Sequence, residues 1–225
     1  MNVEPQRVDV VVGDFARRLQ GLPLRTDEQI RAEVLQENRE TIRQRSRVFA
    51  SRLLPWAGAR RPEWRERVKE PRLRALAERY ELSRGSVLVV GPTGVGKTLT
   101  AMAVARGLLA AAYRTGDVDA LIVRAAWATG PELARALRET RLGSASEALA
   151  EARRTPVLFL DELGQENAPA GWLLELLDDR YRRSTPTFTA SGLTLRELEA
   201  RYGSGAVRRL KEPVGDTLDL FTGQA

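Results

Sequence analysis

The amino-acid sequence predicts an α/β fold, in which a parallel five-stranded sheet is flanked by helices and follows a helical N-terminal region. Two observations indicate this fold. Downstream of about residue 85, short apolar runs alternate with longer stretches of helical pattern, which is typical of buried parallel strands joined by helices. Upstream, apolar residues recur at near-helical spacing instead. We therefore expect a mainly helical, basic region over residues 1–84 and an α/β domain over residues 85–225.

The first predicted element is one long amphipathic helix from Thr26 to about Leu54. Thr26 and Gln29 form a capping-box pattern at its start. The apolar residues that follow recur at near-helical spacing, and they are Ile30, Val34, Ile42, Phe49 and Leu53.

The prolines and glycine of PWAGARRP (55–62) end this helix. A second helix is expected over residues 63–80, with an interruption at Pro71. Near the N-terminus, VDVVV (8–12) is compatible with a short strand, and its structure stays open.

The second region contains the expected strands, which are VLVVG (87–91), ALIVRA (120–125), VLFLDE (157–162), PTFTAS (186–191) and TLDLF (217–221). The helices expected between the first four run from Lys97 to Ala112, from Pro131 to Arg154 with a break near Gly143, and from Ala170 to Arg183. Because these strands are apolar throughout, we expect helices on both faces of the sheet.

The chain contains no cysteine and no histidine. Their absence excludes disulfides, zinc sites built from these residues, and catalysis by a thiol or an imidazole. Any chemistry must therefore use carboxylates, hydroxyls, lysine, arginine or a bound magnesium ion. No apolar run approaches the roughly 18 residues that a membrane-spanning helix needs, and the N-terminus lacks the residue order of a secretory signal. We expect a cytoplasmic protein without a membrane partner.

The net charge of +6 and the isoelectric point near 10.2 favour a polyanionic partner such as DNA. An arginine-rich composition also reflects genome composition, so the distribution of charge is more informative than its sum. Residues 39–79 contain 13 basic and 5 acidic residues, a balance of +8, which leaves −2 for the rest of the chain. The positive charge therefore lies mostly ahead of the α/β domain.

Residues 91–98, GPTGVGKT, match the phosphate-binding pattern G-x-x-x-x-G-K-[ST] between an expected strand and an expected helix. In such a loop the glycines let successive backbone N–H groups point at phosphate oxygens, and the helix N-terminus adds partial positive charge. The lysine supplies a mobile charge to the β- and γ-phosphates, and the threonine hydroxyl ligates magnesium. The predicted nucleotide-binding residues are Gly91, Pro92, Thr93, Gly94, Val95, Gly96, Lys97, Thr98 and Leu99.

The choice of Lys97 supports this interpretation, because only three of the 36 basic residues are lysines. An ammonium on a flexible stem reaches phosphate oxygens in a way that a broad, planar guanidinium does poorly. The alternative is a chance glycine-rich turn, which average residue usage produces in roughly one per cent or fewer of chains this long. ATP is therefore the expected ligand of residues 91–99.

The run VLFLDEL (157–163) ends an apolar strand with two adjacent acids. Carboxylates at the edge of a core are costly unless they are paired or bound to a metal. We predict that Asp161 reaches the magnesium shell with Thr98, and that Glu162 orients and deprotonates an attacking water. Taken alone, two ordinary surface acids explain the pattern equally well. Together with the phosphate loop, the pair favours hydrolysis of ATP.

With both motifs present, residues 86–221 resemble the AAA+ ATPases, and among them the DnaC/IstB type of bacterial helicase loaders and transposition helper ATPases. The resemblance extends to ALIVRAAWATGPELARALRE (120–139), VLFLDELG (157–164), LLDDRYRRSTPTFTAS (176–191), YGSGAVRRL (202–210) and GDTLDLF (215–221). It implies a P-loop NTPase fold with ATP and Mg²⁺ as cofactors, hydrolysis of ATP to ADP, and self-assembly into a homo-oligomer. It also implies catalytic roles for Lys97 and Glu162, and it makes residues 85–225 the ATPase domain.

Two stretches depart from the family pattern. The sensor strand of the family usually ends in a Thr-Ser-Asn-like run, where this sequence has residues 190–192, Ala-Ser-Gly. The resemblance therefore assigns the sensor role, polarising the attacking water, to Ser191 or Thr189. Gly205 stands where the family has an earlier arginine, so the catalytic arginine that reaches a neighbouring subunit is Arg208 or Arg209. The alternative for these two arginines is a solvated face of an arginine-rich protein.

The function implied by the resemblance is ATP-driven action on DNA, most specifically the loading of a replicative helicase as DnaC-like proteins do. The alternatives are an IstB-like transposition helper and a nucleotide-gated adaptor that hydrolyses little. In proteins of this type the region ahead of the ATPase core binds the client, a ring helicase or a transposase. The long helix from Thr26 suits that role, or it packs on its own core. Trp56 and Trp64, which flank Arg60 and Arg61, either stack on single-stranded DNA or are small-core aromatics.

Overall fold

Strands and helices alternate along the chain in the computed structural model, which describes residues 20, 25–52, 64–82, 85–141, 146–167, 171–211 and 217–221. The strands are β1 (Val87–Val90), β2 (Ala126–Thr129), β3 (Leu158–Leu163), β4 (Thr187–Ser191) and β5 (Thr217–Asp219). The helices are α2 (Asp27–Arg52), α3 (Trp64–Arg67), α4 (Pro71–Arg79), α5 (Lys97–Thr115), the 3₁₀ helix η3 (Leu121–Arg124), α6 (Gly130–Arg141), α7 (Glu147–Arg154), α8 (Gly171–Arg182) and α9 (Leu195–Leu210).

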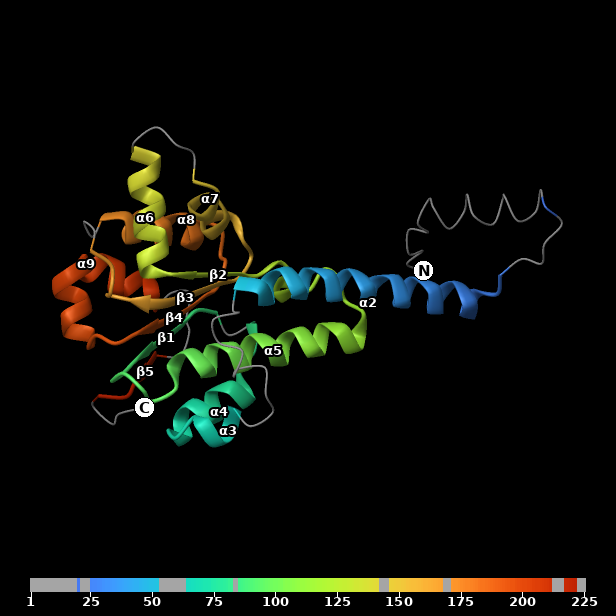
Figure 1. The fold of residues 1–225 in the computed structure, drawn as a ribbon, viewed down its shortest axis with the longest axis horizontal. Coiled ribbons are helices and arrows are strands. Elements are labelled where there is room, and N and C mark those ends of the chain that lie inside the picture. Colours follow the sequence, from blue (N-terminus) through green and yellow to red (C-terminus); the bar gives the residue numbers. More distant parts are fainter. Residues whose placement is uncertain are drawn as a thin grey trace.

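All five strands lie in one parallel sheet in the order β2-β3-β4-β1-β5. The predicted fold, a five-stranded parallel sheet flanked by helices and preceded by a helical region, is confirmed (Figure 1). β1 lies between β4 and β5, and its carboxyl end leads into α5. Because parallel strands end at the same edge of a sheet, the last residues of β1, β3 and β4 meet there.

Helices cover both faces of the sheet (Figure 1). On one face α2, α4 and α5 pack over Val87 and Val89, and on the other face α6 to α9 pack over Leu88 and Val90. Successive side chains of a strand point to opposite faces, so every residue of β1 is buried. Each such side chain contributes about 1.5–3 kcal/mol of burial free energy, which makes β1 a rigid base for the loop that follows it.

A row of aromatic rings ties the N-terminal helices to the sheet. Trp127 of β2 stacks on Phe159 of β3 with 5.6 Å between ring centroids, and Phe159 stacks on Phe188 of β4 at 5.7 Å. Phe49 of α2 contacts Phe159 at 5.9 Å, and Tyr80 meets Phe188 edge-on at 6.0 Å. Offset and edge-on pairs are the favoured aromatic geometries. These contacts therefore stabilise the packing of the N-terminal helices against the sheet.

The long N-terminal helix α2 begins with the predicted capping box. The Gln29 amide nitrogen donates to Thr26 Oγ1 at 3.2 Å, and the Thr26 amide donates to Gln29 Oε1 at 2.9 Å. Its second half packs on the core through Ile42 and Phe49, which are 1% and 6% exposed. Its first turns project past the end of α5 (Figure 1). Packing on the chain's own core is therefore established for the second half, and client binding stays a prediction.

The second predicted helix is present as α3 and α4, with the break ahead of Pro71. Pro71 opens α4, where the missing N–H is not needed, and the Glu70 side chain accepts a hydrogen bond from the Arg72 amide. Trp64 packs against the core as a half-buried aromatic, which supports the small-core alternative for this residue. Trp56, Arg60 and Arg61 lie outside the described residues, as does VDVVV.

One predicted strand is wrong. Residues 121–124 form η3, and the strand β2 begins only at Ala126. Ile122 and Val123 are both buried in the same cluster as α2 and α5 side chains, which adjacent residues of a strand would not share. A short apolar run cannot be assigned by periodicity alone, and here the run AWAT pairs with β3 instead.

The structure also contains α9, which the sequence analysis does not assign. Thr194 and Glu197 form a reciprocal capping box at its start, a pattern visible in the sequence as T-L-R-E. The helix is bent at Gly203, whose φ of 84° and ψ of 156° are not helical. Within the described ranges, no helix is both long and apolar enough to cross a membrane.

Candidate nucleotide-binding site

The phosphate loop connects the end of β1 to the start of α5. Gly94 and Gly96 have φ values of 88° and 105°, a region that favours glycine. Gly96 caps α5, and no side chain caps the first amide groups of that helix. Those N–H groups lack an intrahelical partner and carry the positive end of the helix dipole, so they are available to an anion.

Side chains from distant segments pack against this loop at both of its ends. A β-carbon added to Gly91 would lie 2.7 Å from Leu220 Cβ, which follows β5. A β-carbon on Gly96 would lie 3.1 Å from Val68 Cγ2, which lies between α3 and α4. A β-carbon on Gly94 would meet nothing within 4 Å, so the loop is packed at both ends and open at its apex.

Lys97 crosses the inside of the loop. Its Nζ donates hydrogen bonds to the carbonyl oxygens of Gly91 at 2.8 Å and Pro92 at 2.9 Å. Partial burial lowers the pKa of this ammonium, and the charge of Asp161 opposes that shift. Both hydrogen-bond acceptors are neutral, so the ammonium charge is only partly compensated within the loop. A phosphate group would compensate it fully.

Asp161 lies in β3 and faces the start of α5. It is 5% exposed, and burial raises the pKa of its carboxyl group. A hydrogen bond from the Thr98 side chain, one from the Glu162 amide at 2.9 Å and the charge of Lys97 act against that shift. The structure thus brings together Lys97, Thr98 and Asp161, as the sequence analysis expected.

Glu162 follows at a break in the β3–β4 pairing, where the register shifts between Leu160 and Leu163. Its φ of 53° is unusual for a residue other than glycine. The carboxylate is half-buried and makes no hydrogen bond or ion pair within the described part of the chain. Burial raises its pKa, and the charges of Asp161 and Glu132 add to that shift. An unpaired carboxylate with a raised pKa is suited to accept a proton.

These groups fit a nucleotide with a magnesium ion. The loop offers uncapped N–H groups and an ammonium to phosphates, and the Thr98 hydroxyl and Asp161 carboxylate are the hard oxygen ligands that Mg²⁺ prefers. No group of three or more potential ligand side chains gathers within the described ranges. A magnesium ion would therefore be held in its usual way, by one or two side chains together with phosphates and water.

The start of α6 also belongs to the site, and the sequence analysis missed it. Thr129 lies opposite Asp161 in the sheet. Its amide donates to Glu132 Oε2 at 2.8 Å, and the Glu132 amide donates to Thr129 Oγ1 at 3.3 Å. This reciprocal cap fixes the Glu132 charge that acts on Glu162. The capping-box spacing of residues 129 and 132 is the sequence signal that would have found it.

The side chains of the two sensor candidates are both buried. Ser191 Oγ donates to the Leu163 carbonyl at 2.6 Å and accepts from the Leu193 amide at 3.1 Å. Thr189 is level with Leu88 in the sheet and is fully buried, with a hydroxyl oxygen that makes no hydrogen bond. Ser191 thus joins β4 to β3, and its catalytic role stays a prediction.

The two candidate arginines differ in their surroundings. Arg209 Nε donates to Asp178 Oδ1 of α8 at 2.8 Å, and its guanidinium carbon lies 3.9 Å from the centre of the Tyr181 ring. Arg208 is exposed, and its side chain makes no hydrogen bond or ion pair in the ranges that the structure describes. Of the two side chains, that of Arg208 is therefore the one without contacts to break within the described residues.

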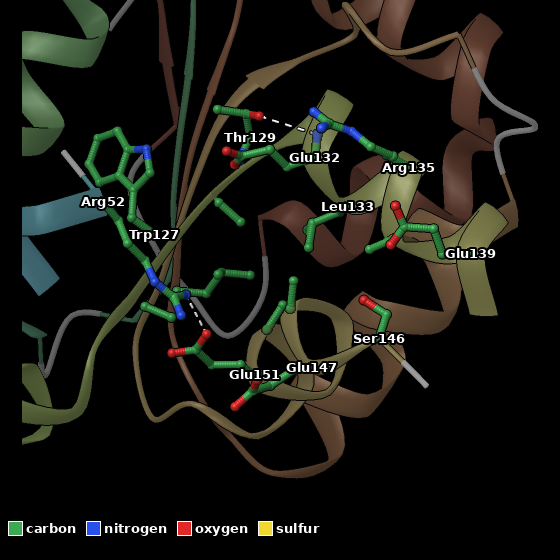
Figure 2. A pocket seen from close by; sticks show the side chains of 16 residues that line it. Arg52, Trp127, Thr129, Glu132, Leu133, Arg135, Glu139, Ser146, Glu147 and Glu151 are labelled. Carbon is green, nitrogen blue, oxygen red and sulfur yellow. Dashed lines mark hydrogen bonds and ion pairs between the residues drawn. The ribbon is translucent and has the colours of Figure 1, made fainter. Parts of the chain in front are cut away.

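A cavity of about 510 Å³ begins at Thr129 and Glu132 and extends away from the loop, beyond the edge strand β2 and between α6 and α7 (Figure 2). Its floor contains small apolar residues of β2, and its rim carries Glu132, Glu139, Glu147 and Glu151 with Arg52 and Arg135. Figure 2 shows Arg52 paired with Glu151 across one side. Four carboxylates against two guanidinium groups would repel a polyphosphate, so the lining of this cavity does not suit a nucleotide.

Compared with models of known families, residues 64–208 match the one described as IstB-like ATP binding protein. The chain belongs to this family. The predicted resemblance to the DnaC/IstB type is thereby confirmed, and the matched span contains the phosphate loop and the acid pair. It also contains α3 and α4, although the predicted boundary lies at residue 85, and the division of labour between the two regions stays a prediction. No match was found among proteins of curated function.

Several solved structures are similar to this IstB-like chain. Domain III of the replication initiation protein DnaA from Thermotoga maritima has a TM-score of 0.50 at 16% identity, covering 71% of this chain and 67% of that one. The DnaC helicase loader has a TM-score of 0.47 at 21% identity, covering 66% of this chain and 86% of that one. DnaI has 0.49 at 22%, covering 66% and 81%. At such identities the likeness concerns the fold alone.

Proposed function

We propose that this IstB-like protein hydrolyses ATP to ADP with Mg²⁺ and uses the reaction to act on DNA together with a client protein. One observation carries the proposal: three charged groups converge at one edge of the sheet. They are the Lys97 ammonium with neutral acceptors, the buried Asp161 carboxylate beside the Thr98 hydroxyl, and the unpaired Glu162 carboxylate. This combination serves phosphate binding, metal binding and proton transfer in one place.

Each group has a separate task in the proposed reaction. The amides of the loop and of the first turn of α5 bind the phosphates, and Lys97 exchanges its carbonyl acceptors for phosphate oxygens. A magnesium ion held through Thr98 and Asp161 supplies neutralisation of the charge that develops on the transferred phosphoryl group. Glu162 orients a water molecule and accepts its proton.

The test compares Glu162→Gln and Lys97→Ala with Glu139→Gln, an exposed carboxylate on α6. Glu162→Gln should retain ATP binding and lose about 10²–10⁴-fold in turnover, whereas Lys97→Ala should lose binding. Because the pKa of Glu162 is raised above its ordinary value of 4.5, turnover should fall as the pH drops through a value above 4.5. This dependence should be weaker in Glu162→Gln, where the raised pKa of Asp161 still contributes. Absence of ATP binding by the wild type, or unchanged turnover in both variants, would refute the proposal.

The DNA part of the proposal rests on charge. Residues 41–52, the last twelve residues of α2, contain four arginines and no acid. Of these, Arg47 is exposed and makes no hydrogen bond or ion pair within the described part of the chain. We expect single-stranded DNA to bind with an affinity that falls steeply with salt, and to change the rate of ATP turnover. A DNA affinity that does not depend on salt, or a turnover indifferent to DNA, would contradict this part.

The client is a ring helicase or a transposase, and the match to the IstB-like family favours the transposase. Capture from the native lysate with the full chain, in the presence of ATP and with Lys97→Ala as control, should distinguish them. A replicative helicase retained only by the wild type identifies a loader. A transposase identifies a transposition helper.

A nucleotide-gated adaptor with little hydrolysis is the second candidate. It is favoured by one observation. The Ser191 hydroxyl donates a hydrogen bond to the Leu163 carbonyl, so this hydroxyl at the end of the sensor strand is not free to bind the attacking water. Stoichiometric ATP binding without turnover, whether or not DNA and client are present, would support the adaptor and contradict the enzyme.

A further inference from the structure

A buried carboxylate outside the predicted site lies just after the acid pair. The Glu166 side chain is fully enclosed, although it follows Glu162 by only four residues. Its Oε2 accepts a hydrogen bond from the Gly164 amide at 3.0 Å, which closes the loop at the end of β3. A buried carboxylate is costly unless it is fully hydrogen-bonded, so its partners indicate what it holds in place.

Those partners come from α9. The Tyr202 hydroxyl donates a hydrogen bond to Glu166 Oε1. Arg201 Nε lies 3.5 Å from the same oxygen, and Arg201 Nη2 donates to the Glu166 backbone carbonyl. Arg201 also contacts Tyr202, through a hydrogen bond of 3.1 Å to its hydroxyl and through its ring. The loop after β3 and the helix α9 are therefore joined by one satisfied polar network, which rigidifies both.

The Glu166 carboxylate also lies next to Gly130, the first residue of α6. A β-carbon on Gly130 would lie 2.6 Å from Glu166 Oε2 and 3.1 Å from the backbone carbonyl oxygen of Glu162. No side chain fits there, so Glu166 is in close contact with Gly130, which lies two residues ahead of Glu132. The Glu166 side chain thus lies between α6, α9 and the backbone after Glu162, the residue with the unusual φ.

The network ends where α9 bends. Tyr202 is followed by Gly203, the residue with φ 84° and ψ 156°. Beyond the bend, residues 204–210 carry Arg208, the exposed arginine. Tyr202 is thus the last residue before the bend that leads to the arm carrying Arg208.

We propose that Glu166 and Tyr202 are positioning residues that hold Glu162 in its unusual backbone conformation and link it to the arm carrying Arg208. This inference rests on the proposed ATP hydrolysis. Neither residue touches the phosphate loop, and their effect on catalysis runs through Glu162 and α9. The alternative is a network that contributes to stability alone.

The experiment compares Tyr202→Phe with Tyr113→Phe in the full chain. Each removes one hydroxyl that makes one cross-element hydrogen bond, because Tyr113 accepts from Arg43 on the opposite face of the sheet. Hydrogen exchange is measured with and without Mg²⁺ and a non-hydrolysable ATP analogue, beside the turnover number and the dissociation constant for ATP. Glu166→Gln is measured in parallel, since it keeps the side-chain shape and removes one acceptor.

In the wild type and Tyr113→Phe, the analogue should protect residues 91–99 and also change exchange in residues 195–210. Tyr202→Phe should keep the first response and lose the second, with turnover lower by about tenfold or more and the dissociation constant within about twofold. Glu166→Gln should behave in the same way. These results establish positioning, because a contribution to stability alone would not separate turnover from binding.

Protection of residues 91–99 without any response in α9 of the wild type overturns this inference and leaves the proposed function intact. So does a turnover of Tyr202→Phe equal to that of Tyr113→Phe. A parallel loss of ATP binding and thermal stability in both Tyr202→Phe and Glu166→Gln assigns the network to stability alone. Failure of the wild type to bind the analogue refutes the proposed function itself.

Discussion

At the scale of single residues, the site contains charged groups whose burial lowers the stability of the folded protein. Asp161 and Glu162 both have a raised pKa because burial disfavours their charged forms. Lys97 has a lowered pKa for the same reason. Groups that are costly in the folded protein and converge on one loop are typical of a functional site, where activity and stability are traded against each other.

The first prediction concerns Asp161→Asn. A carboxyl group whose pKa is raised by folding binds more protons in the folded state, so its ionisation lowers stability as the pH rises from its ordinary value of 3.8 through the raised value. Removing the charge should therefore raise the melting temperature at neutral pH while weakening Mg²⁺-dependent ATP binding. The difference from the wild type should shrink as the pH is lowered. A variant less stable than the wild type at pH 7 would mean that the Thr98 hydrogen bond and Lys97 outweigh burial.

At the scale of elements, the positions of backbone bends decide where side chains go. The register shift in β3 turns Glu162 away from the direction of Asp161. The bend of α9 at Gly203 separates a half tied to Glu166 from a half that carries Arg208. Both bends use positive φ, and both lie beside residues with proposed roles.

The second prediction compares two glycines of α9. Neither Gly203 nor Gly205 has a neighbour closer than 3.8 Å to an added β-carbon, so sterics do not distinguish them. Gly205 has helical geometry, and Gly205→Ala should raise the free energy of unfolding by about 0.5–1 kcal/mol. Gly203→Ala should lower it by about 1 kcal/mol or more, because alanine disfavours the observed φ.

Chemical denaturation measures both changes, and ATP turnover provides a second readout. Gly203→Ala should also lower turnover, since a straightened α9 would displace Arg208. Equal effects of the two substitutions on stability would show that the bend at Gly203 is not maintained in solution.

At the scale of the whole molecule, completion of the site by a second copy is the main expectation. Arg208 is exposed and free of partners in the described ranges, whereas Arg209 is fixed on α8 by Asp178 and Tyr181. A catalytic arginine contributes on the order of 10³-fold or more to phosphoryl transfer. Such an arginine must be mobile enough to reach the neighbouring nucleotide, which favours Arg208.

The third prediction follows from this difference. Arg208→Ala should lower ATP turnover by about 10³-fold with little change in melting temperature, because exposed substitutions rarely alter stability by more than about 0.5 kcal/mol. Arg209→Ala should lower the melting temperature instead. In mixtures, Lys97→Ala subunits should restore turnover to Arg208→Ala subunits, since each provides what the other lacks. No recovery on mixing, with both variants folded, would contradict action between subunits.

Much of the fold and site could be predicted from local patterns. The phosphate loop, the acid pair, the capping box of α2 and the alternation of strands and helices depend on residues close together in the sequence. Their physical causes, such as glycine at positive φ or an apolar strand ending in acids, act over a few residues. Because parallel strands end at the same edge of a sheet, these local motifs also predict that Lys97, Thr98 and Asp161 come together, as they do.

The tertiary structure alone decided the remainder, because it depends on contacts between distant segments. The run at residues 121–124 is a 3₁₀ helix since its apolar side chains pack between α2 and α5. The Ser191 hydroxyl is taken by a carbonyl 28 residues away, and Arg209 by a carboxylate 31 residues away. The sequence determined which groups the chain possesses and how each local segment is bent. Packing determined which of those groups have a partner and which, like the Glu162 and Arg208 side chains, have none among the residues that the structure describes.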